Sequence, residues 1–200
     1  VFSLLRRFDF SFEQHEEIKD FCHTQQIDYL CTPWDEVSVD RLLGLDVCAF
    51  KVASADLTNF PLLTKLASTN LPLILSTGMS SHDEIVSAVS LLKSHNSDFA
   101  ILHCNSTYPA PFSDINLKYI TELQKLHSVV GYSGHERGFT PSLGALTLGA
   151  QIIERHITFD RTLEGPDHAA SLTVDEFSHF VTACRHLEDA LGLGQIGGDL

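Results

Sequence analysis

The sequence predicts an α/β protein, a (β/α)8 TIM barrel that is here incomplete and holds strands 3 to 8. Two observations predict this fold. Short apolar runs of strand length alternate with helix-like segments along the 200 residues, and polar residues stand at the carboxyl end of every predicted strand. Alternating strands and helices form parallel sheets, because each helix carries the chain back to begin the next strand in the same direction.

The predicted strands cover residues 29–32, 48–54, 71–77, 99–104, 129–133 and 152–158. Their starts are 19, 23, 28, 30 and 23 residues apart, the length of a strand plus a returning helix. Ser81 and Thr173 are predicted to begin helices, since each is followed three residues later by a glutamate that can close a capping box. Another helix is predicted over 11–25.

An open, doubly wound sheet has the same alternation, but it binds ligands at one switch point. Here polar residues end all six strands: Thr32 with Asp35; Lys51 with Ser54 and Asp56; Ser76 with Thr77; Asn105 with Ser106; Ser133 with His135; His156 with Thr158. No Gly-x-Gly-x-x-Gly and no Walker lysine loop follows a predicted strand, which removes the usual reasons to expect an open nucleotide-binding sheet. The pattern therefore favours the mouth of a barrel.

Six strands leave an eight-stranded barrel two strands short. The helix over 11–25 leads directly into the first predicted strand, so we expect the two other units to precede Val1. We predict one catalytic barrel domain over 1–191 and a linker over 192–200 toward a further domain. The first and last predicted strands would then have unpaired edges, and the isolated chain is expected to associate.

The composition argues against several classes of function. Thirteen basic against 26 acidic residues give a net charge of −13, which repels nucleic acid and anionic membranes. No apolar run reaches the roughly 20 residues that span a bilayer, and the first residues lack the pattern of a signal peptide. The five cysteines are odd in number and widely spaced, which predicts reduced thiols, three of them in the core, in a cytoplasmic protein.

Four serines stand at the ends of successive strands, and a lysine precedes the first of them. The residues are Ser54, Ser76, Ser106 and Ser133, with Lys51. Converging hydroxyls and one ammonium suit an oxyanion such as phosphate or carboxylate. Serine also ends strands for purely structural reasons, but four in register with a lysine favour an anion site.

His135 and His156 follow neighbouring predicted strands, so their imidazoles could share one divalent cation. Two neutral histidines bonded to the backbone fit the same spacing, and both interpretations stay open at this point. His103 lies inside an apolar strand and is interpreted as a core or supporting histidine. The polar loop over 160–171 could aim Asp167 at a sugar hydroxyl, or it could be an ordinary solvated turn.

The motifs along the chain are Lys51-Val-Ala-Ser54-Ala-Asp56-Leu-Thr-Asn59, Ser76-Thr-Gly-Met79, His103-Cys-Asn-Ser106-Thr-Tyr108-Pro109, Gly131-Tyr-Ser133-Gly-His135, Glu154-Arg-His156-Ile-Thr158 and Gly165-Pro-Asp167-His168-Ala-Ala-Ser171. In this order they resemble the motifs of the sialic acid synthase family. The resemblance runs from about residue 12 to residue 191. Their shared order at barrel spacing makes the set specific, whereas Ser-Thr-Gly-Met alone carries little weight.

The resemblance implies an enzyme that condenses phosphoenolpyruvate with an N-acetylhexosamine, expected to be N-acetylmannosamine, to a nine-carbon 2-keto acid and phosphate. It implies a requirement for Mn²⁺ or Mg²⁺ and a homodimer in the full-length protein. By resemblance, the metal ligands are His135 and His156, and the catalytic groups are these two and Lys51. Phosphoenolpyruvate would be held by Thr32, Lys51, Ser54, Ser76, Ser106 and Ser133, and the sugar by Asp56, Tyr108 and Asp167.

The chain departs from the family pattern in several ways. Ala55 stands where the family has glycine. The family's first two strands bring a catalytic glutamate and a lysine that binds phosphoenolpyruvate, and a C-terminal antifreeze-like domain brings an arginine to the partner's site. The 200 residues hold none of these, so the chain alone is expected to be inactive. A legionaminic or pseudaminic acid synthase, another phosphoenolpyruvate aldolase, a metal-dependent hydrolase and a non-catalytic remnant are the alternatives.

Overall fold

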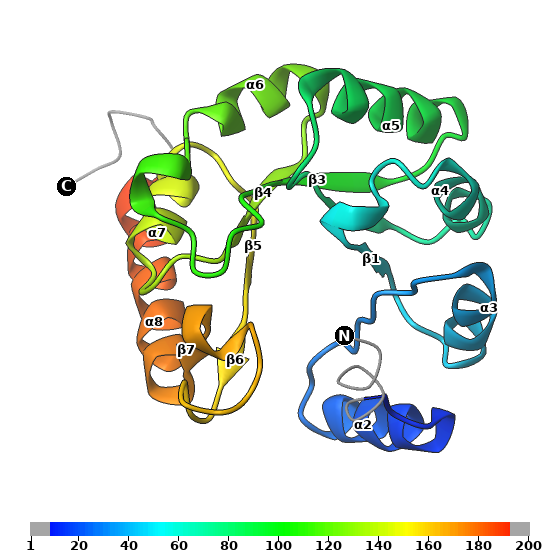
Figure 1. The fold of residues 1–200 in the computed structure, drawn as a ribbon, viewed down its shortest axis with the longest axis horizontal. Helices are drawn as coiled ribbons and strands as arrows, with labels where there is room; N and C mark the ends of the chain where they lie inside the picture. The colour runs from blue at the N-terminus through cyan, green and yellow to red at the C-terminus, as the bar shows by residue number, and fades with distance from the viewer. Residues whose placement is uncertain (1–8, 193–200) are drawn as a thin grey trace, which may run out of the picture.

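Five parallel strands form the main sheet, in the order β1-β2-β3-β4-β5. The computed structural model describes residues 9–192. The strands are β1 (Phe50–Val52), β2 (Leu73–Ser76), β3 (Phe99–Cys104), β4 (Val130–Gly134) and β5 (Ile152–Arg155). The sheet curls into part of a barrel, with the helices along its outer side (Figure 1). The predicted incomplete parallel barrel is confirmed.

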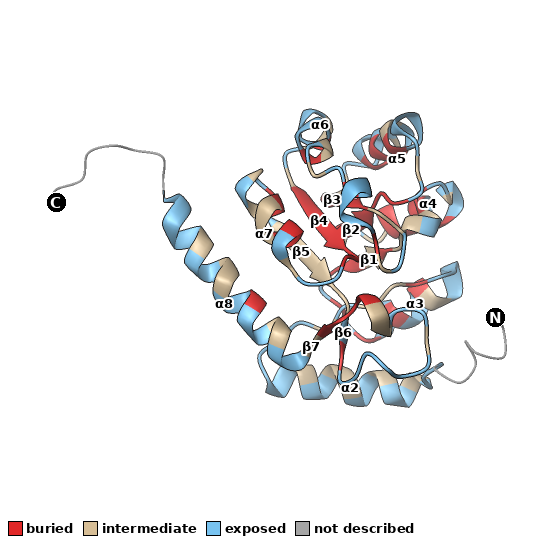
Figure 2. Ribbon diagram, turned by 60° about the vertical axis from the view of Figure 1, so that its left-hand side comes forward, coloured by how far each residue is buried: buried red, intermediate tan, exposed pale blue. Residues whose placement is uncertain are grey.

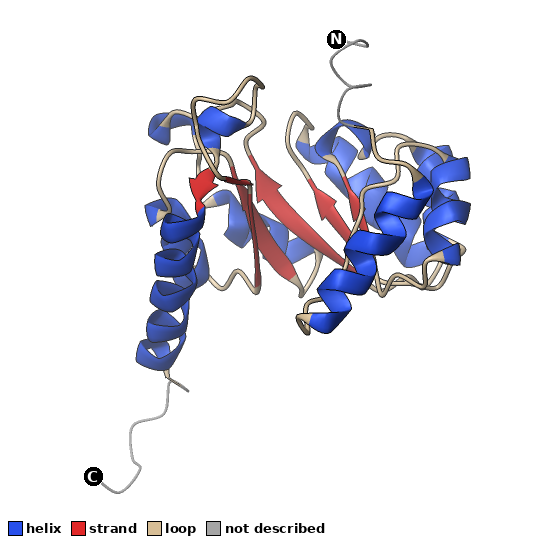
Figure 3. Ribbon diagram, turned by 90° about the horizontal axis from the view of Figure 1, so that it is seen from below, coloured by secondary structure: helices blue, strands red, loops and turns tan. Residues whose placement is uncertain are grey.

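Helices connect the strands and cover the outer face of the sheet, as Figure 3 also shows. They are α2 (Phe12–Thr24), α3 (Glu36–Gly44), α4 (Phe60–Ala67), α5 (His82–Ser94), α6 (Tyr119–Leu126), α7 (Thr140–Thr147) and α8 (Val174–Leu191), with the short 3-10 helices η1 (Ser54–Asp56), η2 (Phe112–Asp114) and η3 (His168–Ala170). The predicted capping boxes of Ser81 and Thr173 are confirmed, since each hydroxyl accepts a hydrogen bond from the backbone N–H of the glutamate three residues later. These caps fix where α5 and α8 begin.

Two predicted strands differ from the structure. The run 29–32 forms only one bridge, between Cys31 and Phe50. Pro33 directly follows this run, and because proline has no N–H to donate, strand pairing cannot continue through it. The run 152–158 is divided at His156. Its second part, β6 (Ile157–Thr158), leaves the main sheet and pairs with β7 (Leu172–Thr173), a strand too short to be seen in the sequence pattern.

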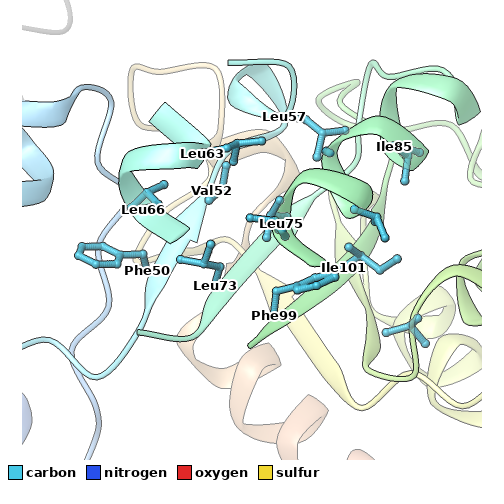
Figure 4. Packing of buried hydrophobic residues seen from close by; sticks show 14 of the residues in the cluster. Phe50, Val52, Leu57, Leu63, Leu66, Leu73, Leu75, Ile85, Phe99 and Ile101 are labelled. Atoms are coloured by element: carbon cyan, nitrogen blue, oxygen red, sulfur yellow. The ribbon is translucent and has the colours of Figure 1, made fainter. Parts of the chain in front are cut away.

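The core lies between the sheet and the helices that cover it. Phe50, Leu73 and Leu75 from the strands are fully buried against Leu63 and Leu66 of α4 (Figure 4). Burying each of these side chains contributes about 1.5–3 kcal/mol to folding. Buried residues gather on the strands, whereas the outer sides of the helices are exposed (Figure 2). This packing holds the strand ends, and therefore their polar residues, at fixed positions.

All five cysteines are free, as predicted. Cys104 is buried in β3, but the expectation of a core thiol is wrong for Cys48, which is exposed in the turn before β1. Among residues 9–192, no helix combines the length and apolar character needed to cross a membrane. Beyond Gly192, the predicted linker lies outside the described residues.

Candidate active site

A cavity of about 380 Å³ lies at the carboxyl ends of the strands. Nine of the eleven predicted site residues line it: Thr32, Lys51, Ser54, Ser76, Ser106, Tyr108, Ser133, His135 and His156. The parallel sheet explains this convergence, because all carboxyl ends of parallel strands meet at one edge. Trp34, Met79, Cys104 and Glu154 also line the cavity, and the sequence patterns assigned no role to them.

Two predicted sugar ligands, Asp56 and Asp167, do not line this cavity. The carboxylate of Asp56 accepts a hydrogen bond of 3.0 Å from the amide of Asn59, the N-cap of α4, so it belongs to the start of that helix. Asp167 is exposed at the rim, with its carboxylate 4.0 Å from Nδ1 of His156. Ala55 lies in η1 without a positive φ, so alanine in place of the family's glycine causes no backbone strain there.

Lys51 and Ser133 both contact Glu154, a residue of β5. Nζ of Lys51 lies 3.6 Å from one carboxylate oxygen of Glu154, and the hydroxyl of Ser133 donates to the other at 2.7 Å. Glu154 precedes His156 by two residues, so strand alternation predicts both on the same face. That spacing is the sequence signal that could have identified Glu154. The carboxylate thus holds the lysine and the serine at one wall of the cavity.

The other hydroxyls cluster around Cys104 and Gly78. Ser54 accepts a hydrogen bond of 3.0 Å from the N–H of Gly78, and its Oγ lies 3.6 Å from Sγ of Cys104. Oγ of Ser106 lies 3.8 Å from the same sulfur. The hydroxyl of Ser76 is buried and has no hydrogen-bond partner in the described part of the chain. Such a group costs about 1–3 kcal/mol, and an anion that accepts its proton would remove this cost.

We predict that Gly78→Ala disrupts the hydroxyl cluster. A Cβ at this position would lie 2.1 Å from Oγ of Ser106 and 2.8 Å from Oγ of Ser54, so both hydroxyls must move. Phosphate affinity, measured by calorimetry, should fall about tenfold or more, the value of a lost hydrogen bond to a charged group. Gly44→Ala is the control, since a Cβ there meets nothing within 4 Å. Equal phosphate affinity in both variants would contradict the assignment.

The two predicted metal-ligating histidines lie together at the cavity. Their ring centroids are 5.1 Å apart. Nδ1 of His135 lies 2.7 Å from the backbone oxygen of Asn105, which can only accept, so this nitrogen carries the proton. Nε2 is then an acceptor, and it receives the hydroxyl of Tyr108 at 2.9 Å. His103 instead bonds the backbone oxygen of Ile115 at 2.6 Å and is a core histidine, as predicted.

A cation bound by the two imidazoles would have open coordination positions. Residues 9–192 contain no group of three or more histidine, cysteine or acidic side chains that could hold a metal ion. His135 and His156 would therefore supply two nitrogen ligands, and water or ligand oxygens would complete the coordination. The lone pair of His135 Nε2 could bind a cation once the hydrogen bond from the Tyr108 hydroxyl is broken.

Burial shifts the pKa values of several side chains that line the cavity. Desolvation lowers the pKa of His135, and it lowers that of His156 with a further contribution from the neighbouring His135. Both imidazoles are therefore neutral at neutral pH, the state that binds metal. Burial also lowers the pKa of Lys51, which Glu154 opposes, and raises the pKa of Tyr108. The phenol therefore remains protonated and can donate.

Burial of histidines predicts a loss of stability in mild acid. The pKa values of His103, His135 and His156 are lowered from 6.5 by desolvation. Below pH 6.5, these histidines therefore bind more protons in the unfolded chain than in the folded chain. The free energy of unfolding should be largest above pH 6.5 and fall as pH drops through the folded pKa values. The hydrogen bond from Arg161 lowers the pKa of Glu176 to about 2. Protonation of Glu176 therefore lowers the free energy of unfolding only below pH 4.5.

Urea unfolding at pH 7.5 and 5.5 measures this dependence. His103→Gln, which keeps a donor for the Ile115 carbonyl, should show a smaller difference between the two pH values than the native chain does. A free energy of unfolding that is equal or higher at pH 5.5 in the native chain would contradict the prediction.

Comparison with known proteins decides the family. Residues 1–196 match the model described as the NeuB family. The chain belongs to the NeuB family. It is 41% identical over 189 residues to N-acetylneuraminate-9-phosphate synthase of Homo sapiens, covering 94% of the chain and 53% of the relative. It is 38% identical over 195 residues to N,N'-diacetyllegionaminic acid synthase of Campylobacter jejuni, covering 96% and 58%. The resemblance read from the motifs is confirmed.

The NeuB fold is also seen in a solved relative. The crystal structure of N-acetylneuraminic acid synthetase from Leptospira borgpetersenii, in complex with citrate, superposes with a TM-score of 0.91 at 35% identity. The match covers 96% of this chain and 67% of that one. The chain thus spans little more than half the length of the two enzymes it matches in sequence.

Proposed function

We propose that this chain forms the cation site and one anion site of a phosphoenolpyruvate-dependent synthase of nine-carbon 2-keto sugar acids. The observation that carries the proposal is one shared cavity. Lys51 and the unpartnered hydroxyl of Ser76 line it together with the paired imidazoles of His135 and His156. An anionic and a carbonyl substrate could therefore lie side by side.

The anion end is assigned to phosphoenolpyruvate. Lys51 and the serine hydroxyls supply a charge and donors for its phosphate or carboxylate, and Thr32 lines the same cavity. Glu154 now contacts both Lys51 and Ser133. When an anion binds, the hydroxyl of Ser133 would turn from the glutamate to the ligand, while Glu154 would stay near Lys51 and keep its ammonium group protonated.

The histidine end is assigned to the sugar aldehyde. A divalent cation, Mn²⁺ or Mg²⁺, bound by His135 and His156 would polarise the aldehyde oxygen. The Asn105 carbonyl holds His135 in the tautomer that presents Nε2. Tyr108 and the rim residue Asp167 lie next to the imidazoles and could bond sugar hydroxyls. In the overall reaction, C3 of phosphoenolpyruvate bonds to the aldehyde carbon, water adds at C2, and the bond from C2 to the phosphate oxygen breaks.

The sugar is proposed to be an N-acetylhexosamine, with N-acetylmannosamine as the expected substrate. Relatives at 34–41% identity are named for N-acetylneuraminate 9-phosphate, N,N'-diacetyllegionaminic acid and pseudaminic acid. The first two names include N-acetyl groups, which supports an acylated amino sugar as the substrate class. The free cysteines accord with a cytoplasmic location. A homodimer remains part of the proposal, to be tested by sedimentation.

Calorimetry with phosphoenolpyruvate and ³¹P NMR of phosphate release test the function. We expect the chain with Mn²⁺ to bind phosphoenolpyruvate. Phosphate release should need an added sugar and should be fastest with N-acetylmannosamine or its 6-phosphate, tested in a chimera that places residues 9–192 in the human relative. A chain that does not bind phosphoenolpyruvate, together with an inactive, folded chimera, would refute the proposal.

A further inference from the structure

A buried ion pair joins the chain neighbours of the two histidines. Glu136 follows His135, and Arg155 precedes His156. Both charged side chains are 0% exposed, and Nη1 of Arg155 lies 2.6 Å from Oε1 of Glu136. Arg155 also donates to the backbone oxygen of Glu136 at 2.6 Å, and Tyr132 donates to Oε2 at 2.7 Å. The pair therefore links the ends of β4 and β5 through side-chain and backbone bonds.

The ion pair joins β4 and β5 at the point where their backbone pairing ends. The last paired residues of β4 and β5 are Gly134 and Arg155, so His135 and His156 lie one step beyond the ladder. Arg155 is the last residue of β5, and Glu136 lies beside it because the two side chains form an ion pair. The bond from the Arg155 guanidinium to the Glu136 carbonyl joins the two chain segments where strand pairing no longer does.

The backbone leaves room for this pair. A Cβ at Gly134 would lie 2.8 Å from Oε2 of Glu136 and 2.8 Å from Cε1 of Tyr132. Any side chain at position 134 would therefore force Tyr132 or Glu136 to move. On the other side of the pair, Nη1 of Arg155 donates to the Ser142 hydroxyl at 3.1 Å. These contacts hold the two charges in one arrangement.

We propose that Glu136 and Arg155 are positioning residues that set the separation of His135 and His156 for one shared divalent cation. This inference rests on the proposed function of the cavity. Stability alone does not explain the pair, because a buried ion pair is often no more stabilising than apolar residues of similar size. A guanidinium that bonds both a carboxylate and a carbonyl fixes distance and direction, which an apolar contact does not.

Mn²⁺ titration of the chain, followed by electron paramagnetic resonance, tests the inference. Arg155→Lys keeps the charge but loses the fork of donors, and we expect a 10- to 100-fold weaker affinity for Mn²⁺. The double variant Glu136→Leu with Arg155→Met keeps the net charge and can pack without buried ions, so it should fold and show the same loss. Leu123→Ala, in the buried core on α6, is the control for lowered stability.

The outcomes separate the two proposals. A native chain that binds no Mn²⁺ would overturn the proposed function and this inference with it. Native binding that is unchanged in the folded double variant would overturn the inference alone. An equal loss in Leu123→Ala would show that reduced stability is sufficient, and it would also overturn the inference.

Discussion

His156→Ala is expected to weaken Mn²⁺ binding by more than about a hundredfold, beyond the usual effect of removing a residue that only supports a ligand. The reason is the small donor set. The described residues offer two imidazoles at this point and no group of three or more metal-binding side chains. Loss of one imidazole leaves a single nitrogen. His135→Ala should have the same effect, measured by the electron paramagnetic resonance titration.

His179→Ala is the matched control, because it removes an exposed histidine of α8 far along the chain from the cavity. Phosphate affinity without metal should be unchanged in His156→Ala, which would show that the cavity is still folded. Strong Mn²⁺ binding retained by both histidine variants would place the cation elsewhere.

Lys51→Ala is expected to reduce the affinity for phosphoenolpyruvate by about 10- to 150-fold, or about 1.5–3 kcal/mol. The side chain of Lys51 is only 14% exposed and lies 3.6 Å from Glu154. Its removal deletes a charge-assisted contact and also leaves the Glu154 carboxylate facing the incoming anion. In an active enzyme, KM for phosphoenolpyruvate should rise while KM for the sugar stays unchanged.

The double variant Lys51→Ala with Glu154→Gln separates these two causes. It should recover part of the lost affinity, since the repelling carboxylate is gone. Lys125→Ala, which breaks an exposed pair with Glu122, is the control and should have no effect. Unchanged affinity for phosphoenolpyruvate in Lys51→Ala would remove the lysine from the anion site.

The sequence predicts best what strand geometry determines. Ser76, Ser133 and His135 line one cavity, as strand order predicts, because parallel strands bring their carboxyl ends to one edge. Asp56 is the last residue of η1 and Asp167 directly precedes η3, and side chains in such short turns follow no periodic pattern of directions. The strand pattern therefore could not show that neither side chain lines the cavity.

Residues whose role depends on a partner from another strand were missed. The spacing of Glu154 and His156 predicts a shared face, but the contacts of Glu154 with Lys51 and Ser133 are visible only in the structure. Glu136 and Arg155 read in the sequence as ordinary charged residues, yet both are fully buried. Hydrophobic periodicity predicts which side chains of a strand face the core. It does not predict that two charged residues far apart in the sequence, such as Glu136 and Arg155, form an ion pair.

An anomalous difference map from crystals soaked with Mn²⁺ and phosphoenolpyruvate tests the central claim most directly. The account predicts one manganese peak at about 2.0–2.3 Å from Nε2 of His135 and from a ring nitrogen of His156. Phosphoenolpyruvate should lie in the same cavity, with oxygen atoms at hydrogen-bond distance from Lys51 and Ser76. Manganese bound away from both imidazoles, or phosphoenolpyruvate bound outside this cavity, would contradict the account.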